Sequence, residues 1–249
     1  MPIALITGGS RGLGRATALA LAARGYDAVI TYRSGEHEAA AVVDALRSHG
    51  RRAAALPLDT ADAASIDALV EALPGTVAAL GHERLDVLVQ NAGVAGRTVL
   101  GETAADTVRS LFEIHVLGVV LLTQALAPRI ADGGRIITVS SGLARFTAPG
   151  MSVYGAMKAA VESLTRSWAV ELGGRGITVN AIAPGPTATD FGGGVIRDDA
   201  DYRRAIVAST ALGRVGERDD IGSAIALLVD PGAGWITGQR IEVSGGTRL

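Results

Sequence analysis

The sequence predicts one doubly wound α/β domain, in which helices cover both faces of a parallel sheet of seven strands. Short apolar runs alternate along the chain with longer stretches of helical periodicity, which is the pattern of such a fold. The chain has 249 residues, of which 48% are hydrophobic, so it is long and apolar enough to build one large core. No linker, low-complexity tract or internal repeat divides it, and residues 1–249 are read as a single domain.

The strands and helices are expected from these runs. The seven strands are expected at residues 3–6, 28–32, 53–58, 85–89, 135–139, 177–182 and 240–243. The main helices are expected at residues 12–24, 36–49, 62–80, 103–130 and 153–173, with further helices before the last strand. Gly25 and Gly50 are typical helix stops, and Pro74-Gly75 is expected to interrupt the third helix.

Composition excludes several classes of function. The formal net charge is −2 and no basic tract occurs, so nucleic acid is not an expected partner. Cysteine is absent, which removes disulfides, thiolate metal sites and cysteine nucleophiles, and the four scattered histidines predict no metal site. No stretch approaches 18 uninterrupted apolar residues, and the N-terminus lacks a basic region and a cleavage site. We therefore expect a soluble cytoplasmic protein with no membrane span.

A glycine-rich turn, TGGSRGLG at residues 7–14, separates the first strand from the first helix. Gly8, Gly12 and Gly14 would allow a tight turn and a close approach of the backbone to a pyrophosphate, which the helix N-terminus would face with free N–H groups. The G-x-x-x-G-x-G spacing differs from the commoner G-x-G-x-x-G, and alone it fits a structural turn equally well. Its place between a strand and a helix favours dinucleotide binding.

The end of the second strand bears on which dinucleotide is bound. It reads Tyr32-Arg33-Ser34 and lacks the acidic residue that binds the ribose hydroxyls in NAD-preferring sites. Arg33, together with Arg11 of the glycine turn, could hold a 2′-phosphate through bidentate hydrogen bonds. The alternative is two solvated surface arginines. We predict NADP(H) over NAD(H).

Several motifs in a fixed order resemble the short-chain dehydrogenase/reductase family over nearly the whole chain. They are the glycine turn, Asp59, Asn91-Ala92-Gly93, Ser141, Tyr154-Gly-Ala-Met-Lys158, Asn180, Pro184-Gly185 and Thr189. The resemblance implies a Rossmann fold and a nicotinamide cofactor. It also implies that Asp59 contacts the adenine amino group, that residues 91–93 pass beside the ribose, and that Thr189 steadies the carboxamide. The cofactor-binding residues expected are Gly8, Ser10, Arg11, Gly12, Leu13, Gly14, Arg33, Ser34, Asp59, Thr60, Asn91, Ala92, Gly93, Tyr154, Lys158, Pro184, Gly185, Thr187 and Thr189.

Tyr154 and Lys158 carry the predicted chemistry. They are four residues apart on one helix, which places both on one face. A carbonyl being reduced needs a proton for its oxygen, and a nearby ammonium is expected to lower the pKa of the tyrosine that supplies it. The resemblance also assigns Lys158 to the nicotinamide ribose. Ser141 is expected to hold the substrate oxygen, whereas its neighbour Ser140 is expected to cap the strand end.

His115 stands where the family usually has a catalytic asparagine that holds a water in a proton relay. A histidine can also donate and accept hydrogen bonds. A buried histidine that only fills space is an equally good interpretation, and the two remain open.

The function expected is interconversion of a ketone and a secondary alcohol, with a small-molecule carbonyl or alcohol as substrate. Reduction of a 3-oxoacyl thioester is the main alternative, and a non-catalytic dinucleotide-binding sensor or scaffold is an alternative of another class. Epimerisation or dehydration on the same fold has no specific support.

The least regular segment and the helix around Tyr154 give two further expectations. Residues of about 186–200, with glycines at 192–194, are expected to form a substrate lid. The expected pocket residues are Val94, Arg145, Phe146, Met151 and Phe191. The resemblance implies a homotetramer. The apolar side chains of the helix expected at 153–173 are spaced so that they could form an extensive buried face, which is consistent with such an assembly. These residues are Val161, Leu164, Trp168 and Leu172.

Overall fold

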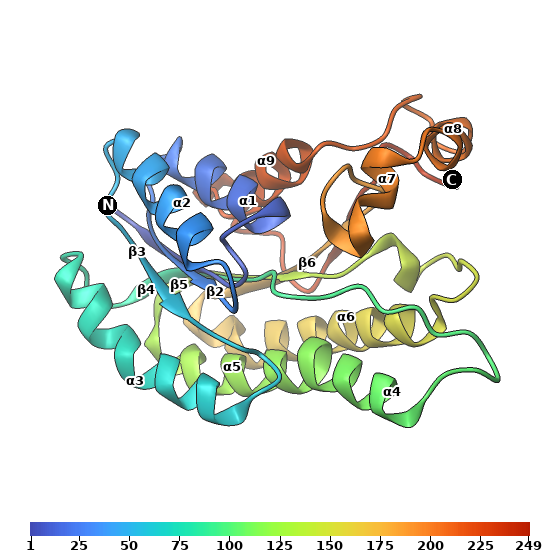
Figure 1. The fold of residues 1–249 in the computed structure, drawn as a ribbon. Helices are drawn as coiled ribbons and strands as arrows, with labels where there is room; N and C mark the ends of the chain where they lie inside the picture. The colour runs from blue at the N-terminus through green and yellow to red at the C-terminus, as the bar shows by residue number, and fades with distance from the viewer.

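A parallel sheet of seven strands runs through the middle of the protein in the computed structural model, which describes residues 1–249 (Figure 1). The strands are β1 (Ile3–Ile6), β2 (Asp27–Tyr32), β3 (Ala53–Pro57), β4 (Leu85–Gln90), β5 (Ile130–Val139), β6 (Thr178–Pro184) and β7 (Arg240–Val243). Their order in the sheet is β3-β2-β1-β4-β5-β6-β7, and all neighbours pair in parallel. The predicted doubly wound sheet is confirmed.

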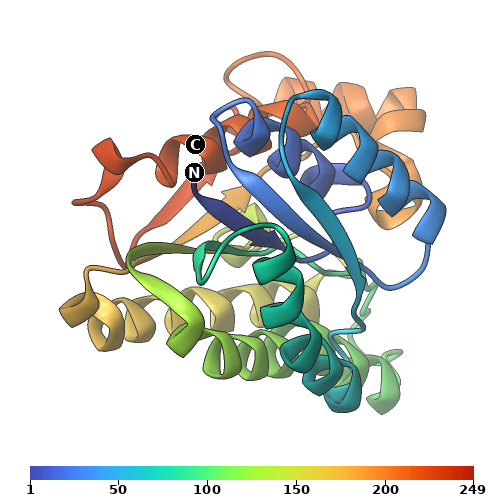
Figure 2. The same ribbon diagram turned by 90° about the vertical axis from the view of Figure 1, so that its left-hand side faces the viewer.

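Helices cover both faces of the sheet, as two views at right angles show (Figures 1 and 2). One face carries α1 (Gly12–Ala22), α2 (Glu36–Ser48) and α9 (Arg218–Leu228). The other carries α3 (Ala63–Ala79), α4 (Ala105–Phe112), α5 (Gly118–Leu126) and α6 (Ser152–Leu172). Two short helices, α7 (Val195–Asp198) and α8 (Ala200–Ala208), stand at one end, beyond β6.

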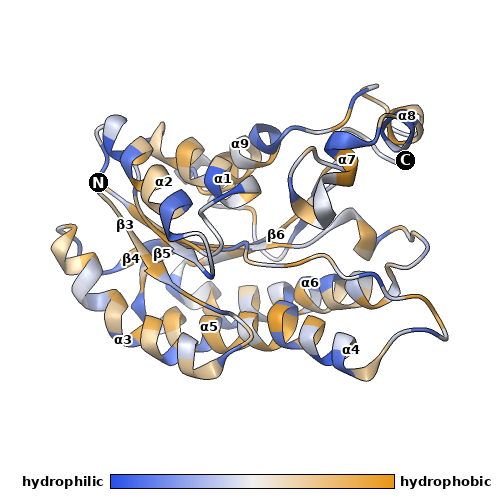
Figure 3. Cartoon of the chain, viewed as in Figure 1, coloured by the Kyte–Doolittle hydropathy of each residue, from blue (hydrophilic) through white to orange (hydrophobic).

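The strand pleat divides the apolar core between the two helical layers. In β1, Ala4 and Ile6 face the cluster that includes α1, α2 and α9, whereas Ile3 and Leu5 face the cluster that includes α3 and α5. All four side chains are fully buried, and the apolar colour in Figure 3 follows this interior. Burial of each large aliphatic side chain stabilises the fold by about 1.5–3 kcal/mol. This core fixes the positions of the strands, and the candidate functional residues lie in the loops that follow their carboxyl ends.

The predicted break at Pro74-Gly75 is wrong. Helix α3 continues through Pro74, which lies inside it. Proline removes one hydrogen bond and disfavours the interior of a helix. Here both Pro74 and Gly75 are exposed, so water can satisfy the freed carbonyl, while Leu73 and Val77 are buried in the core on either side. Packing of the inner face outweighs the local preference.

The long helix expected over residues 103–130 is present but is not uniform. A five-residue π-helix, Glu113–Leu117, lies between α4 and α5. The stretch Ala105–Arg129 is also long and apolar enough to span a membrane by length and composition, although polar residues interrupt its apolar run. Leu122 and Leu126 of this stretch are buried in the core beside α3, so it serves here as a core helix.

A buried cluster of ionisable side chains connects the segments that lead into β2, β3 and β4, at the amino-terminal ends of these strands. The Asp27 carboxylate is fully buried and accepts hydrogen bonds from the backbone N and Nε of Arg52 and from Nε2 of His82, each at 2.8 Å. Burial alone would raise the pKa of the Asp27 carboxyl, but the hydrogen bonds from His82 and Arg52 outweigh it and lower the pKa.

We expect Asp27→Asn to lower the free energy of unfolding at pH 7 by about 1.5–3 kcal/mol, the range for hydrogen bonds to a charged group. A carboxyl whose pKa is depressed by folding contributes stability above its unfolded pKa and loses it as pH falls through the folded pKa. The difference between wild type and variant should therefore shrink below about pH 4. Urea denaturation at pH 7 and pH 3 measures it, and a difference that is constant between the two would contradict this account.

Candidate active site

The candidate site lies where the direction of strand order reverses, between β1 and β4, at the carboxyl ends of the strands. Parallel sheets bind ligands in the crevice at this point, because the loops after the two strands lead to opposite faces of the sheet. The loop after β1 is the glycine turn, and the loop after β4 begins with Asn91.

Asn91 fastens the two loops together. Its Nδ2 donates to the carbonyl oxygens of Thr7 at 2.8 Å and Gly8 at 3.2 Å. In return, the Thr7 hydroxyl oxygen accepts from the backbone N of Asn91 and of Ala92, each at 2.9 Å. A Cβ on Gly14 would overlap the Gly8 carbonyl and lie 2.6 Å from Asn91 Nδ2, so this position must be glycine. The glycine turn therefore has one fixed shape.

The shape of the turn fits a pyrophosphate. Gly12 has a φ of +55°, and nothing lies within 4 Å of the place where its Cβ would be. Helix α1 begins immediately after, with no side-chain cap and no acidic residue in its first turn. Its first N–H groups have no partner within the helix and lie beside this open side of Gly12. Ser10 is buried beneath the turn, and Leu13 packs against the core.

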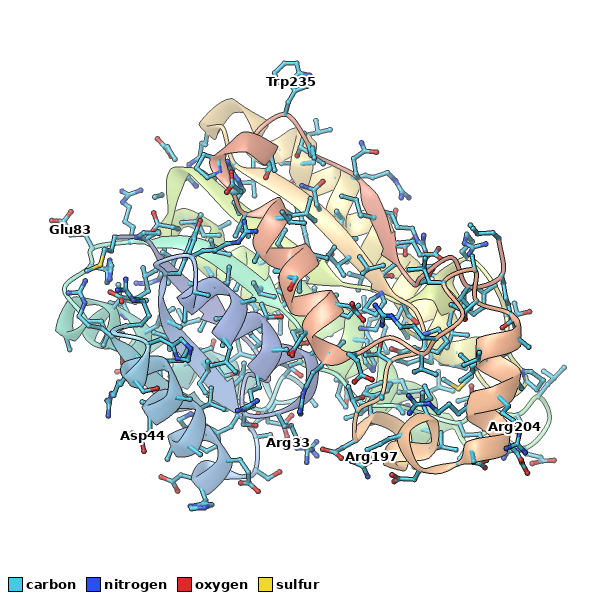
Figure 4. The ribbon with its side chains drawn as sticks, turned by 90° about the horizontal axis from the view of Figure 1, so that it is seen from above. Arg33, Asp44, Glu83, Arg197, Arg204 and Trp235 are labelled. Carbon is cyan, nitrogen blue, oxygen red and sulfur yellow. The ribbon has the colours of Figure 1, made fainter.

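The residues predicted to select the cofactor surround this turn. Arg11, Arg33 and Ser34 are exposed, and no side chain pairs with either arginine. Figure 4 shows Arg33 projecting into solvent. Asp59 follows β3, and its Oδ1 accepts from the backbone N of Ala61 at 3.0 Å. The carbonyl of the buried Thr60 approaches Gly118 so closely that a Cβ there would overlap it.

The three predicted catalytic residues meet on the other side of the crevice. Ser141 follows β5, and its hydroxyl oxygen accepts from the backbone N of Leu143 at 3.1 Å. Tyr154 and Lys158 lie on the first turns of α6, each only 5% exposed. Lys158 Nζ donates to the Val139 carbonyl at 2.8 Å and lies 5.7 Å from the centre of the Tyr154 ring.

The side chain of Ser140 lies away from Tyr154, on the side of Glu162, whereas that of the neighbouring Ser141 lies beside Tyr154. The Ser140 hydroxyl donates to Oε1 of Glu162 at 2.6 Å, on the buried side of α6. The same carboxylate accepts from Nε of Arg240 on β7 at 2.8 Å. Ser140 thus belongs to a polar network that ties β5, α6 and β7 together behind the site.

Burial sets the protonation of the Tyr154–Lys158 pair. Burial raises the pKa of Tyr154 to about 12, although a hydrogen bond with Ser141 acts in the opposite direction. Burial lowers the pKa of Lys158 to about 8. The expectation that the ammonium gives Tyr154 a lowered pKa is therefore wrong for this structure, because desolvation of the phenolate is the larger effect. Tyr154 is a protonated phenol at neutral pH.

His115 lies beside this pair, at the middle of the π-helix. It is 1% exposed, and its ring meets the Tyr154 ring edge to face, with the centroids 5.3 Å apart and the planes at 90°. Its Nε2 is 2.9 Å from the carbonyl oxygen of Val94. Burial and the Lys158 charge lower the pKa of His115 to about 3, against the opposing effect of the Val94 contact. The imidazole is neutral.

The segment after β6 forms the far wall. A Cβ on Gly185 would come within 2.5 Å of Ser244, so the chain passes β7 closely here. The Thr187 hydroxyl donates to the Gly185 carbonyl at 2.9 Å, and Thr189 Oγ1 accepts from the Phe191 backbone at 3.3 Å. Pro184, the other member of the predicted turn, is the last residue of β6.

The predicted pocket residues separate into two groups. Phe191 faces the site, since its ring centre is 6.0 Å from that of Tyr154, and Val94 borders His115. Arg145 instead binds both carboxylate oxygens of Glu242 at 2.7 and 2.8 Å, and Phe146 packs beneath it. Met151 immediately precedes α6 and pairs with Thr98. Arg145 therefore lies in the support of the site rather than facing Tyr154.

Some functional features escaped the sequence analysis. The Thr7 hydroxyl fixes the loop after β4, and the Val139 carbonyl orients Lys158. A threonine at a strand end is a common residue, and a backbone acceptor has no signature in sequence. The π-helix at His115 has none either, because its apolar pattern continues that of the flanking helices.

The comparisons with known proteins agree with this architecture. Residues 8–248 match a family model described as enoyl-(acyl carrier protein) reductase. The 3-oxoacyl-[acyl-carrier-protein] reductase of Synechocystis is 36% identical over 98% of this chain and 96% of its own length.

Two solved structures are closely similar. A short-chain dehydrogenase from Burkholderia cenocepacia in complex with NADP has a TM-score of 0.89 and 37% identity, covering 100% of this chain and 98% of that one. The promiscuous reductase LugOII, which catalyses keto-reduction at C1 in lugdunomycin biosynthesis, has a TM-score of 0.94 and 35% identity, with coverage of 100% and 98%.

The hydrogen bonds from Asn91 Nδ2 to the carbonyls of Thr7 and Gly8 can be tested by substitution. Asn91→Asp would place a carboxylate against the two carbonyl oxygens that the amide now serves, so it should destabilise the fold by about 2–3 kcal/mol and weaken NADPH binding. Asn91→Ala removes the donor without adding a charge and should be milder. Urea denaturation and a fluorescence titration with NADPH measure both effects. An alanine variant more damaging than the aspartate would contradict the assignment.

Proposed function

Because the chain belongs to the short-chain dehydrogenase/reductase family, we propose that it interconverts a ketone and a secondary alcohol with NADP(H) as the hydride carrier. It is an NAD(P)-dependent oxidoreductase. The observation that carries the proposal is the meeting of Ser141, Tyr154 and Lys158 across the crevice from the glycine turn. A non-catalytic dinucleotide sensor would not need these three groups together.

The chain connects the two halves of the crevice. Gly93 is two residues from Asn91, which holds the glycine turn, and a Cβ on Gly93 would lie 3.8 Å from Lys158 Nζ. The turn and the α1 N-terminus would hold the pyrophosphate, and Lys158 the nicotinamide ribose. When bound, the dinucleotide supplies or accepts the hydride.

Proton transfer belongs to Tyr154 in this proposal. A phenol whose pKa is raised to about 12 is protonated at neutral pH and can donate to a carbonyl oxygen as that oxygen gains charge. The Ser141 hydroxyl donates a second hydrogen bond to the same oxygen. Lys158, with its pKa lowered to about 8, is mostly an ammonium at pH 7 and stabilises the phenolate that remains.

Relatives support two substrate classes within this reaction. The similarity to LugOII, which catalyses a keto-reduction, supports a free ketone as the substrate, and the similarity to the Synechocystis reductase supports a 3-oxoacyl thioester as the second candidate. We propose that residues 186–200 close over the substrate. Gly192, Gly193 and Gly194 all have a left-handed φ, between +66° and +78°, so this hinge can rotate with little strain.

We further propose that the protein assembles as a homotetramer. Val170 on α6, Leu227 on α9 and Trp235 before β7 are 83%, 60% and 99% exposed. Figure 4 shows Trp235 projecting away from the molecule. Contact with a second copy of the chain would remove these apolar side chains from water, which favours association. Of the α6 residues first expected in that role, Trp168 and Leu172 pack against the chain's own core.

Tyr154→Phe tests the reaction. The change keeps the ring and its contacts with His115 and Phe191, so NADPH binding and the melting temperature should stay near wild type. Turnover should fall by roughly 10²-fold to 10⁴-fold, the scale of general acid catalysis. NADPH oxidation should be followed with an aryl ketone, a 3-oxoacyl thioester and a 2-enoyl thioester. Reduction of only the enoyl substrate, or full activity in Tyr154→Phe, would refute the proposal.

Arg33→Asp tests the cofactor preference. Arg33 is exposed and pairs with no other side chain, so its replacement should leave folding unchanged. Loss of hydrogen bonds to a 2′-phosphate should weaken NADPH binding by about 10-fold to 100-fold, while NADH binding is kept or improved. Arg33→Gln, without the added negative charge, is the matched control. Equal affinity of the wild type for the two cofactors would contradict the preference.

A further inference from the structure

The segment that follows β7 connects two parts of the molecule that are distant in the sequence. This segment comprises residues 245–249, and we call it the strap. On one side it pairs with residues 209–212, directly after α8, where the backbone N of Arg248 donates to the Ser209 carbonyl at 2.9 Å. Figure 1 shows this end of the chain beside α8. On its other side the strap contacts the loop after β5, which begins with Ser141.

Two arginines bind each other's segments at this contact. Arg145, on the loop, donates from Nη2 to the Thr247 carbonyl at 3.0 Å and from Nη1 to the Arg248 carbonyl at 3.1 Å. Arg248, on the strap, donates from Nη1 to the Thr147 carbonyl at 2.6 Å. Both guanidinium groups also lie over the ring of Phe146, at 5.4 and 5.1 Å from its centre. The loop and the strap are thus held together from both sides.

The backbone of Arg248 is strained. Its φ is +52°, and it is the only residue other than glycine with a positive φ in the chain. This left-handed conformation is unfavourable for a residue with a Cβ and persists only where the surroundings determine it. The other left-handed positions of the strap are glycines, Gly245 and Gly246. An arginine kept at such a position indicates that its side chain is used.

Phe146 connects the strap to Ser141. A Cβ on Gly142 would lie 2.7 Å from Cε1 of Phe146, so the ring packs directly against the residue after Ser141. The Ser141 hydroxyl oxygen accepts from the backbone N of Leu143 in the same short turn, and Ser141 also hydrogen-bonds with Tyr154. A displaced Phe146 ring would therefore shift the turn that orients the Ser141 hydroxyl.

We propose that Arg248 is a positioning residue, which holds Phe146 and Thr147 and thereby keeps the Ser141 hydroxyl directed at Tyr154 and the substrate oxygen. The proposal rests on the proposed function, because that reaction gives Ser141 its role. Arg248 is exposed and acts only through the loop. A small misplacement of a hydrogen-bond donor weakens the stabilisation of the charge that develops on the carbonyl oxygen, so the rate of the chemical step depends on this contact.

Arg248→Gly removes the guanidinium, and glycine adopts the left-handed φ without strain, so the strap should keep its path. Turnover of a ketone should fall about fivefold, the equivalent of one lost hydrogen bond, while NADPH affinity and the melting temperature stay near wild type. Arg248→Lys can keep a cation over Phe146 and a donor to the Thr147 carbonyl, so its turnover should return to within about twofold of wild type.

Arg84→Gly is the matched control, because Arg84 is exposed in the loop before β4, where the chain has no contact with the strap. Its turnover and melting temperature should equal those of the wild type. A loss in Arg84→Gly as large as that in Arg248→Gly, or no recovery in Arg248→Lys, would overturn the proposal.

A double-mutant cycle distinguishes positioning of Ser141 from a general structural effect. Ser141→Ala removes the hydroxyl that Arg248 is proposed to orient. In that background Arg248→Gly should change the single-turnover rate by less than about twofold, because no hydroxyl remains to be oriented. A further fivefold loss, roughly the full effect of one hydrogen bond, would show that Arg248 acts independently of Ser141 and would refute the proposal.

Hydrogen exchange tests the contact without turnover. The backbone N–H groups of Arg145 and Phe146 both donate to the Gly142 carbonyl, at 2.9 and 3.1 Å. They should exchange about fivefold faster in Arg248→Gly than in wild type, and at the wild-type rate in Arg84→Gly. Unchanged exchange in Arg248→Gly would contradict the proposal. If the wild type reduced no ketone, the proposed function would fail, while this measurement would still decide whether Arg248 holds the loop.

Discussion

The Asn91 amide is the contact on which the crevice depends. Its two donated hydrogen bonds fix the carbonyls of Thr7 and Gly8, and the Thr7 hydroxyl fixes the start of the opposite loop. A Cβ on Gly14 would overlap the Gly8 carbonyl and crowd Asn91 Nδ2, so the first turn of helix α1 packs closely against this junction. The open side of Gly12 lies two residues before Gly14, at the start of the same helix. The shape of the glycine turn and the path of the chain towards Gly93 thus depend on the side chains of Asn91 and Thr7, each at the end of a strand.

A second set of contacts supports the catalytic side from behind. Glu162 on α6 binds both Ser140 and Arg240, and Arg240 and Arg145 share the carboxylate of Glu242. The two arginines lower the pKa of Glu242 to about 2, although burial opposes them, so this carboxylate is charged under all ordinary conditions. The network links β5, α6 and β7 at the level of Ser141. Arg145 therefore stabilises the wall of the site from outside and does not need to contact a substrate.

The sequence predicted a parallel sheet of seven strands with helices on both of its faces, because short apolar runs alternate along the chain with longer stretches of helical periodicity. The resemblance to the family also named Ser141, Tyr154 and Lys158, and the structure brings the loop after β5 beside the first turns of α6, while their catalytic role stays a prediction. The errors concern effects that arise only in three dimensions. The exposure of Pro74 is decided by the packing of its neighbours, and the π-helix at His115 continues an unchanged apolar pattern. The raised pKa of Tyr154 results from burial, which a four-residue spacing does not measure.

Burial has opposite effects on the pKa values of the acidic and basic groups of the site, and this sets their protonation at neutral pH. It raises the pKa of Tyr154 to about 12 and lowers that of Lys158 to about 8. It also lowers the pKa of His115 to about 3, with help from the Lys158 charge. Of the three groups, only Lys158 titrates near neutral pH in this structure. Tyr154 is then a protonated phenol at neutral pH, and the His115 imidazole is neutral. In the proposed reaction the positive charge of Lys158 would stabilise the phenolate that remains after Tyr154 gives up its proton, so the contact between Lys158 Nζ and the Val139 carbonyl would affect turnover by orienting that charge.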